Sequence, residues 1–139
     1  MTALFAFLLG ITLSILTIYN LKEKLNLNNT YSVTAFQVGV YKSIENAEKM
    51  KEQYPNSLIV QDKEYYRVYI GVSTGTNWTN ALEKYFLEQN VSVYPKEIQV
   101  THKFYEQLNE YKTIFDNSDA SVYERLNGEI MKKIEGEIL

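Results

Sequence analysis

The sequence contains no cysteine and only one histidine, His102. The absence of cysteine excludes disulfides, zinc–thiolate sites, iron–sulfur clusters and thiol nucleophiles. Basic residues do not predominate either, because 17 Asp and Glu residues outnumber 14 Lys and Arg residues and give a formal net charge of −3. Nucleic-acid binding normally uses a basic patch, so this balance disfavours it. We therefore expect no metal site, no cofactor and no nucleic-acid partner.

The sequence also offers few residues for catalysis. Asp62 with Glu64, and Asp116 with Asp119, are pairs of carboxylates in predicted turns, where turn formation and capping explain them. The segment Gly71–Gly75 lacks the Lys-Ser/Thr ending of a phosphate-binding loop. We therefore expect a protein that is not an enzyme and assign no catalytic residue.

The first 21 residues carry no charged side chain, and an apolar stretch runs from Ala3 to Tyr19. A helix rises about 1.5 Å per residue, so roughly 20 residues cross a hydrocarbon layer of about 30 Å. No Lys or Arg precedes the stretch and no small-x-small site follows it, which disfavours a cleaved signal peptide. We expect residues 1–21 to form a single-pass transmembrane helix and residues 22–31 to form a short polar linker.

The pattern of the next segment, residues 32–100, predicts an α+β domain. Strands are predicted where apolar and polar residues alternate or an extended apolar run occurs, namely 33–41, 58–61, 65–70 and 91–100. Helices are predicted where apolar residues recur at helical spacing, namely 43–54 and 77–89. The order β-α-β-β-α-β is that of a ferredoxin-like fold, a four-stranded antiparallel sheet with two helices on one face. The other face of the sheet is then expected to be open.

Residues 101–139 carry two apolar stripes at helical spacing and predict a C-terminal helical pair. The first stripe comprises Phe104, Leu108, Tyr111 and Phe115, and the second comprises Val122, Leu126, Ile130, Ile134 and Ile138. Ser121 and Glu124 have the spacing of a capping box, which predicts the start of the second helix. These stripes need to be buried against each other, against the α+β domain, or against a partner protein.

Strand alternation predicts which side chains lie on the open face of the sheet. Gln37 and Gly39 come from the first strand, and Tyr65, Arg67 and Tyr69 come from the third. Phenol faces cover the C–H patches of sugars, while amide and guanidinium groups bond to sugar hydroxyls, so this platform suits a saccharide. The alternative is a solvated face on which tyrosine was selected for strand propensity.

Two motifs resemble the SPOR (sporulation-related repeat) domain. Phe36-Gln-Val-Gly-Val-Tyr41, followed by Ser43-x-x-Asn-Ala47, resembles the opening of that domain. Tyr66-Arg-Val-Tyr-Ile-Gly71, followed by Asn80-Ala-Leu82, is similar to its second repeat. The resemblance covers residues 32–100 and implies the same ferredoxin-like fold. The sequence departs from the family pattern at Val72-Ser73, where Pro-Phe is usual, and at Tyr41, which replaces a Phe.

SPOR domains bind bacterial peptidoglycan through the open face of the sheet and favour glycan strands without stem peptides. By position, the resemblance implies this role for Gln37, Gly39 and Arg67. Alternation adds Tyr41, Tyr65 and Tyr69, and the fourth strand adds Tyr94. The predicted glycan-binding residues are Gln37, Gly39, Tyr41, Tyr65, Arg67, Tyr69 and Tyr94.

The resemblance also implies a location, because peptidoglycan lies outside the cytoplasm. Lys22 and Lys24 after the apolar stretch weakly favour a cytoplasmic domain, but the expected ligand favours the extracytoplasmic side of the bacterial cytoplasmic membrane. We expect a membrane-anchored, peptidoglycan-binding protein of the cell envelope that acts in cell division or sporulation. Two alternatives are a membrane-tethered adaptor whose C-terminal helices recruit a protein partner, and RNA binding on the sheet, which the acidic charge disfavours.

Overall fold

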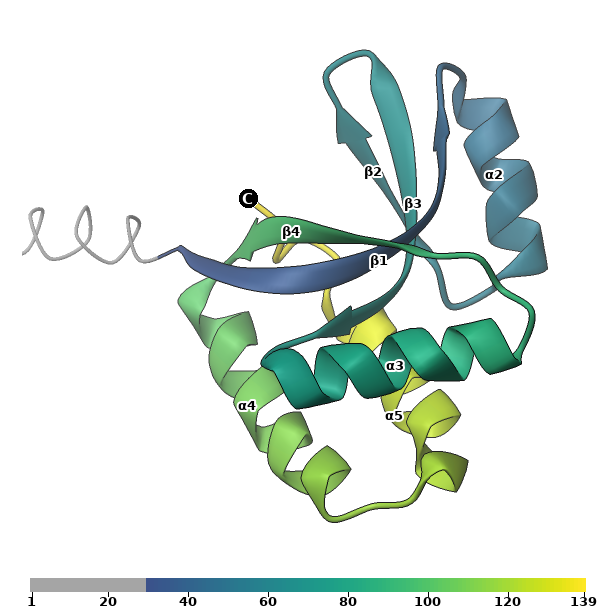
Figure 1. Cartoon of the computed structure of the whole chain (residues 1–139). Helices are drawn as coiled ribbons and strands as arrows, with labels where there is room; N and C mark the ends of the chain where they lie inside the picture. Colours follow the sequence, from purple (N-terminus) through teal and green to yellow (C-terminus); the bar gives the residue numbers. More distant parts are fainter. Residues whose placement is uncertain (1–29) are drawn as a thin grey trace, which may run out of the picture. The chain divides into compact units, whose positions relative to one another are not determined.

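The computed structural model describes residues 30–139 and shows an α+β fold with a four-stranded antiparallel sheet (Figure 1). The elements are β1 (Tyr31–Tyr41), α2 (Ile44–Gln53), β2 (Leu58–Asp62), β3 (Tyr65–Ser73), α3 (Thr76–Glu88), β4 (Tyr94–Val100), α4 (His102–Asp116), the 3₁₀ helix η1 (Ala120–Val122) and α5 (Tyr123–Lys133). Within residues 30–139, no helix is long and apolar enough to span a bilayer. The predicted transmembrane helix over 1–21 lies outside the described residues.

The predicted strands and helices of residues 32–100 are confirmed, and their ends differ by up to three residues. β3 is longer than predicted because Gly71 to Ser73 pair with Phe36 to Thr34 of β1. β4 begins later than predicted because its pairing with β1 starts only at Tyr94, opposite Gln37. The predicted helical pair of the tail is also confirmed, as α4 and α5.

The four strands lie in the order β2-β3-β1-β4, and every neighbouring pair is antiparallel. The register between β1 and β3 shifts twice, between Phe36 and Gln37 and between Gln37 and Gly39. Such bulges increase the twist of a strand pair. In Figure 1, β1 and β4 accordingly run across the β2–β3 hairpin at a steep angle.

Two helices, α2 and α4, begin with a side-chain cap, and the cap predicted for α5 is absent. The Ser43 side chain accepts a hydrogen bond from Asn46 N (3.4 Å), and the Thr101 side chain accepts one from Phe104 N (3.3 Å). The capping box predicted at Ser121 is wrong, because α5 has no side-chain cap. Ser121 lies inside η1, where its backbone N–H donates to the Asp119 carboxylate instead (3.1 Å).

Helices pack on both faces of the sheet. On one face, the Phe36 ring lies 5.5 Å from the Phe86 ring of α3. Tyr31 points to the opposite face, because it is an odd number of positions from Phe36 in a regular part of β1, and its ring stacks on Tyr105 of α4 at 4.5 Å. The two-helix prediction therefore needs a correction: the C-terminal helices cover part of the face that was expected to be open.

α5 lies beside an edge of β3 that has no neighbouring strand. β2 pairs with β3 only as far as Tyr69, so Ile70 and the residues after it have a free edge. Asn127 of α5 donates a hydrogen bond from its Nδ2 to the Ile70 carbonyl (2.7 Å). A Cβ on Gly71 would lie only 2.9 Å from Asn127 Oδ1 and 3.0 Å from the Phe86 ring. Glycine is therefore required where α3 and α5 both approach β3.

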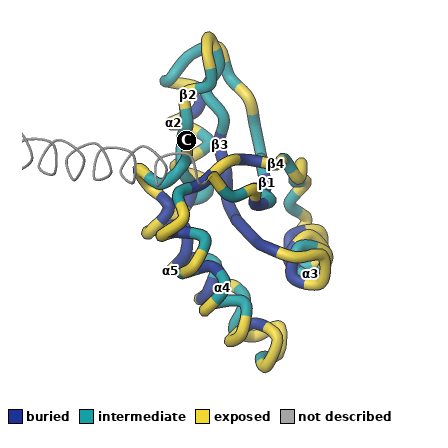
Figure 2. Tube along the Cα trace, turned by 90° about the vertical axis from the view of Figure 1, so that its left-hand side faces the viewer, coloured by how far each residue is buried: buried dark blue, intermediate teal, exposed yellow. Residues whose placement is uncertain are grey.

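The C-terminal helices belong to the hydrophobic core. The Phe115 ring stacks on Trp78 of α3 (5.4 Å) and on Tyr123 of α5 (4.3 Å). Figure 2 shows buried residues concentrated along one half of β3 and on the inner sides of the helices. The tail residues that are buried in this core are Phe104, Leu108, Phe115, Leu126, Ile130, Met131 and Ile134. The predicted stripes are therefore covered largely by the chain itself.

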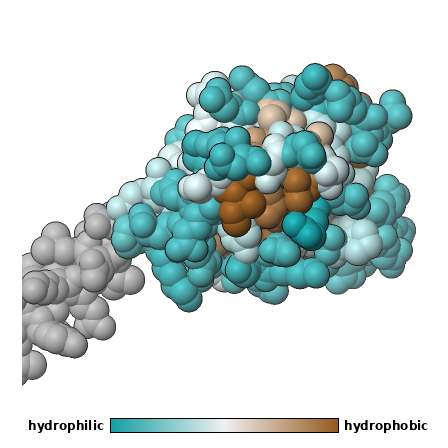
Figure 3. Space-filling model, turned by 90° about the horizontal axis from the view of Figure 1, so that it is seen from below, coloured by the Kyte–Doolittle hydropathy of each residue, from teal (hydrophilic) through white to brown (hydrophobic). Residues whose placement is uncertain are grey.

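The residues after α5 return to the outer edge of β4. Ile138 forms an antiparallel bridge with Val100, and Leu139 N donates to Gln99 O (3.0 Å). Viewed from the side of α3, α4 and α5, the surface is mostly hydrophilic around one central apolar area (Figure 3).

Truncating Leu108, which is fully buried in α4, should show that the tail is part of the core. Leu108→Ala is expected to lower the free energy of unfolding by about 2–5 kcal/mol, because it removes buried methyl groups and leaves a cavity. Ile114→Ala is the matched control in the same helix, since Ile114 is 48% exposed. Denaturant unfolding of the full chain measures both, and equal stability of the two variants would contradict this packing.

Candidate functional site

Five of the seven residues predicted for the site share one face of the sheet. Gln37 lies directly opposite Tyr69 on β3 and Tyr94 on β4. Tyr65 and Arg67 alternate with Tyr69 along β3 and therefore point to the same side. The structure brings these five residues together from β1, β3 and β4.

The alternation prediction is wrong for Gly39 and Tyr41, which point to the opposite face. The register shift after Gln37 leaves one extra residue in β1, so Gly39 pairs with Val68 and Tyr41 pairs with Tyr66. A bulge of this kind reverses the side on which the following residues point. Gly39 also leaves no open space through which a ligand could approach the backbone, because a Cβ there would lie 2.5–2.7 Å from atoms of the Tyr41 phenol.

Tyr69 and Tyr94 occupy this face very differently. Tyr69 is only 2% exposed and belongs to the hydrophobic core, whereas Tyr94 is 77% exposed. Burial raises the pKa of the Tyr69 phenol above its ordinary value, since a buried phenolate would lose its hydration. Tyr69 therefore lies beneath this face as part of the core, and Tyr94 is its most exposed aromatic ring, with Tyr65 partly buried.

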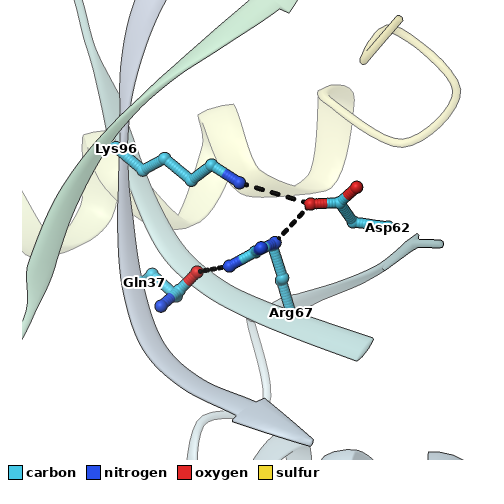
Figure 4. A network of polar contacts seen from close by, with 4 residues as sticks. All are labelled: Gln37, Asp62, Arg67 and Lys96. Carbon is cyan, nitrogen blue, oxygen red and sulfur yellow. Dashed lines mark hydrogen bonds and ion pairs between the residues drawn. The ribbon is translucent and has the colours of Figure 1, made fainter. Parts of the chain in front are cut away.

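A polar network of Gln37, Asp62, Arg67 and Lys96 lies on this face of the sheet (Figure 4). Arg67 donates from Nε to Asp62 Oδ2 (2.7 Å) and from Nη1 to Gln37 Oε1 (2.9 Å). Lys96 Nζ donates to the same Asp62 oxygen (3.4 Å). Each of the four strands contributes one residue to this Gln37–Arg67–Asp62–Lys96 network, so its geometry depends on the whole sheet.

The network carries two positive charges and one negative charge, in a chain whose net charge is −3. The pKa of the Asp62 carboxyl is lowered, mainly by the hydrogen bond from Arg67 and further by Lys96, while partial desolvation opposes the shift. The side chains of Arg67, Asp62 and Lys96 are 22%, 38% and 37% exposed. The network is thus ordered and still accessible to solvent.

A groove of about 250 Å³ lies beside the network. Its lining includes Asp62, Lys96, Tyr69, Ile98, Ile138 and Leu139. Extending the alternation from Tyr94 by two residues would have identified Lys96. Asp62 looks like a turn residue until the hairpin register is known, and the groove wall formed by Ile138 and Leu139 depends on where the tail packs.

No protein-family model, curated protein or solved structure matches this chain. The resemblance to the SPOR domain therefore depends on the two sequence motifs alone. In the part of the chain from 30 to 139, no group of three or more His, Asp or Glu residues could hold a metal ion. The arrangement on the sheet consists of fixed hydrogen-bond donors and acceptors beside an exposed aromatic ring, which is suited to binding a polar ligand.

The lowered pKa of Asp62 predicts a definite pH dependence. The folded-state pKa lies below the ordinary value of 3.8, so the ion pair stabilises the fold at pH values above that value. This contribution is lost as the pH falls through the folded-state pKa. Carboxyl chemical shifts measured by NMR during an acid titration should show this low pKa.

Two variants separate the partners of Asp62. Arg67→Gln should return the pKa of Asp62 most of the way to its ordinary value, because it removes the shorter contact of 2.7 Å. Lys96→Gln should raise that pKa less, because its contact is 3.4 Å. A larger effect from Lys96→Gln would contradict the arrangement described.

Proposed function

We propose that this protein is a non-catalytic, membrane-anchored module that binds glycan strands of bacterial peptidoglycan on the extracytoplasmic side of the cytoplasmic membrane. The observation that carries this proposal is the Gln37–Arg67–Asp62–Lys96 network, held beside the exposed ring of Tyr94. A role in cell division or sporulation follows from the family resemblance and is part of the same proposal.

The fold supports the proposal through its strand order. The order β2-β3-β1-β4, with α2 after β1 and α3 after β3, fits a ferredoxin-like arrangement of β1 to β4, which the SPOR resemblance implies. The proposed site is smaller than the whole sheet face, because α4 and the end of the chain occupy part of that face. It comprises Gln37, Tyr65, Arg67, Tyr94 and Lys96, with Asp62 as the internal partner of the two cations.

The charge of the site suits the proposed ligand. Removing a stem peptide from a glycan strand leaves a free carboxylate on the sugar, and two cations sharing one internal carboxylate have capacity for a second anion. The Tyr94 ring can cover an apolar sugar face, and the Gln37 amide can bond to hydroxyl or N-acetyl groups. Such an open site should bind weakly, because it encloses little of the ligand.

Co-sedimentation with amidase-treated cell-wall sacculi tests the proposal. The full chain should pellet with the sacculi, and both Tyr94→Ala and the double variant Gln37→Ala with Arg67→Ala should bind about tenfold more weakly. A factor of ten corresponds to about 1.4 kcal/mol, which is reasonable for one aromatic contact or a small set of hydrogen bonds. Leu87→Ala is the control, because Leu87 is 69% exposed on α3. Unchanged pelleting of the double variant would remove Gln37 and Arg67 from the site.

Membrane orientation is tested separately with reporters fused after Leu139. The proposal expects an active alkaline phosphatase fusion, because that enzyme matures only where disulfides can form. A matched fusion to a fluorescent protein that folds only in the cytoplasm should be dark. The opposite pair of results would place the domain away from the cell wall and would contradict the proposed ligand.

The alternative function, an adaptor that recruits a protein through its C-terminal helices, has less support. It was suggested by apolar stripes that needed a covering surface, and the chain itself buries Phe104, Leu108 and Leu126. Deleting residues 102–139 would not test it, because the deletion removes part of the core. A protein partner of the tail therefore remains a prediction that these contacts do not favour.

A further inference from the structure

A second cleft lies between the loop after α2, the end of α3 and α5, and it shares no lining residue with the network or the groove beside it. Its volume is about 300 Å³, which is within the size range of small-molecule sites. Its apolar lining includes Ile70, Phe86 and Val91. The cleft can therefore hold the apolar body of a small ligand.

The polar lining of this cleft favours a positively charged ligand. Glu124 is the only charged residue in the lining, which otherwise contributes amides and hydroxyls. Burial, and next the nearby charge of Glu124, raise the pKa of the Tyr85 phenol. Tyr85 is therefore a neutral phenol near pH 7, and the lining itself contains no cation that would pair with the Glu124 carboxylate.

Two buried polar atoms belong to residues of the same cleft and lack a hydrogen-bond partner. They are Ser57 Oγ and Asn127 Oδ1, and Ser57 is only 6% exposed. The bond from Asn127 Nδ2 to the Ile70 carbonyl fixes the orientation of the amide, so its oxygen faces the protein as an acceptor. Buried polar atoms without partners are rare and costly in folded proteins. Both atoms lie beneath the surface of the cleft, so they belong to its packed wall and are not open to a ligand.

The cleft walls are closely fitted around these atoms. A Cβ on Gly128 would lie 3.2 Å from Asn56 Nδ2, so the glycine lets α5 approach the loop after α2. The same loop carries Ser57, so the position of the Ser57 hydroxyl depends on how closely α5 packs against the loop. The wall of the cleft is thus held by packing between separate elements.

We propose that this cleft binds a small organic cation, namely a primary ammonium group on a short apolar body. The ammonium pairs with the exposed Glu124 carboxylate, and the apolar body packs on Ile70, Phe86 and Val91. The proposal does not depend on glycan binding, because the two sites have no residue in common.

A matched pair of probes tests this proposal on the full chain. Phenethylamine and 2-phenylethanol have the same apolar body, but only the amine carries a positive charge near pH 7. Backbone NMR signals of Ser57, Ile70 and Asn127 should shift saturably with the amine, and the alcohol should bind about tenfold more weakly or not at all, because it lacks the charge-assisted hydrogen bond.

Two charge variants complete the experiment. Glu124→Gln should weaken amine binding about tenfold and leave alcohol binding unchanged, while Glu83→Gln, an exposed residue of α3 outside the cleft, should bind the amine like the unmodified chain. Equal affinity for amine and alcohol, or unchanged amine binding by Glu124→Gln, would overturn the cation assignment. The absence of shifts at all three backbone signals would overturn the site itself.

Discussion

The attachment of α5 to the free edge of β3 is the interaction on which the rest of the structure depends. β2 is too short to pair with Ile70 and the residues after it, and Asn127 satisfies the Ile70 carbonyl in place of a strand. This attachment brings the buried side of α5 into the core, with α4 and α3 joined through the stacked rings of Phe115, Trp78 and Tyr123. The tail is consequently part of the domain and also determines how much of the sheet remains accessible.

The accessible part of the sheet owes its order to cross-strand contacts. Arg67 is held by Gln37 on one side and by Asp62 on the other, and Lys96 reaches the same carboxylate from β4. Because the residues come from four strands, a ligand of the proposed site would meet side chains that are already positioned and would cost little conformational entropy on binding. The same contacts mean that part of the binding capacity of Arg67 is already used within the chain.

The sequence predicted the helices and strands well, but it predicted less well on which side of the sheet each residue points. Helix and strand periodicity depends on neighbouring residues, so α2, α3, α4 and α5 and all four strands could be predicted. The bulge after Gln37 could not be predicted from alternation, and it moved Gly39 and Tyr41 to the other side of the sheet. The packing of the tail depends on long-range contacts, and it turned Tyr69 from an expected ligand contact into a core residue.

The return of the chain to β4 has a consequence for self-association. Unpaired strand edges are sites at which other chains can add to a sheet and start aggregation. Ile138 and Leu139 occupy the outer edge of β4 near Val100, and α5 shields the end of β3. Of the described strands, β2 and the first part of β4 keep outer edges without such cover, so any templated growth of this sheet would begin from Leu58–Asp62 or from residues 94–98.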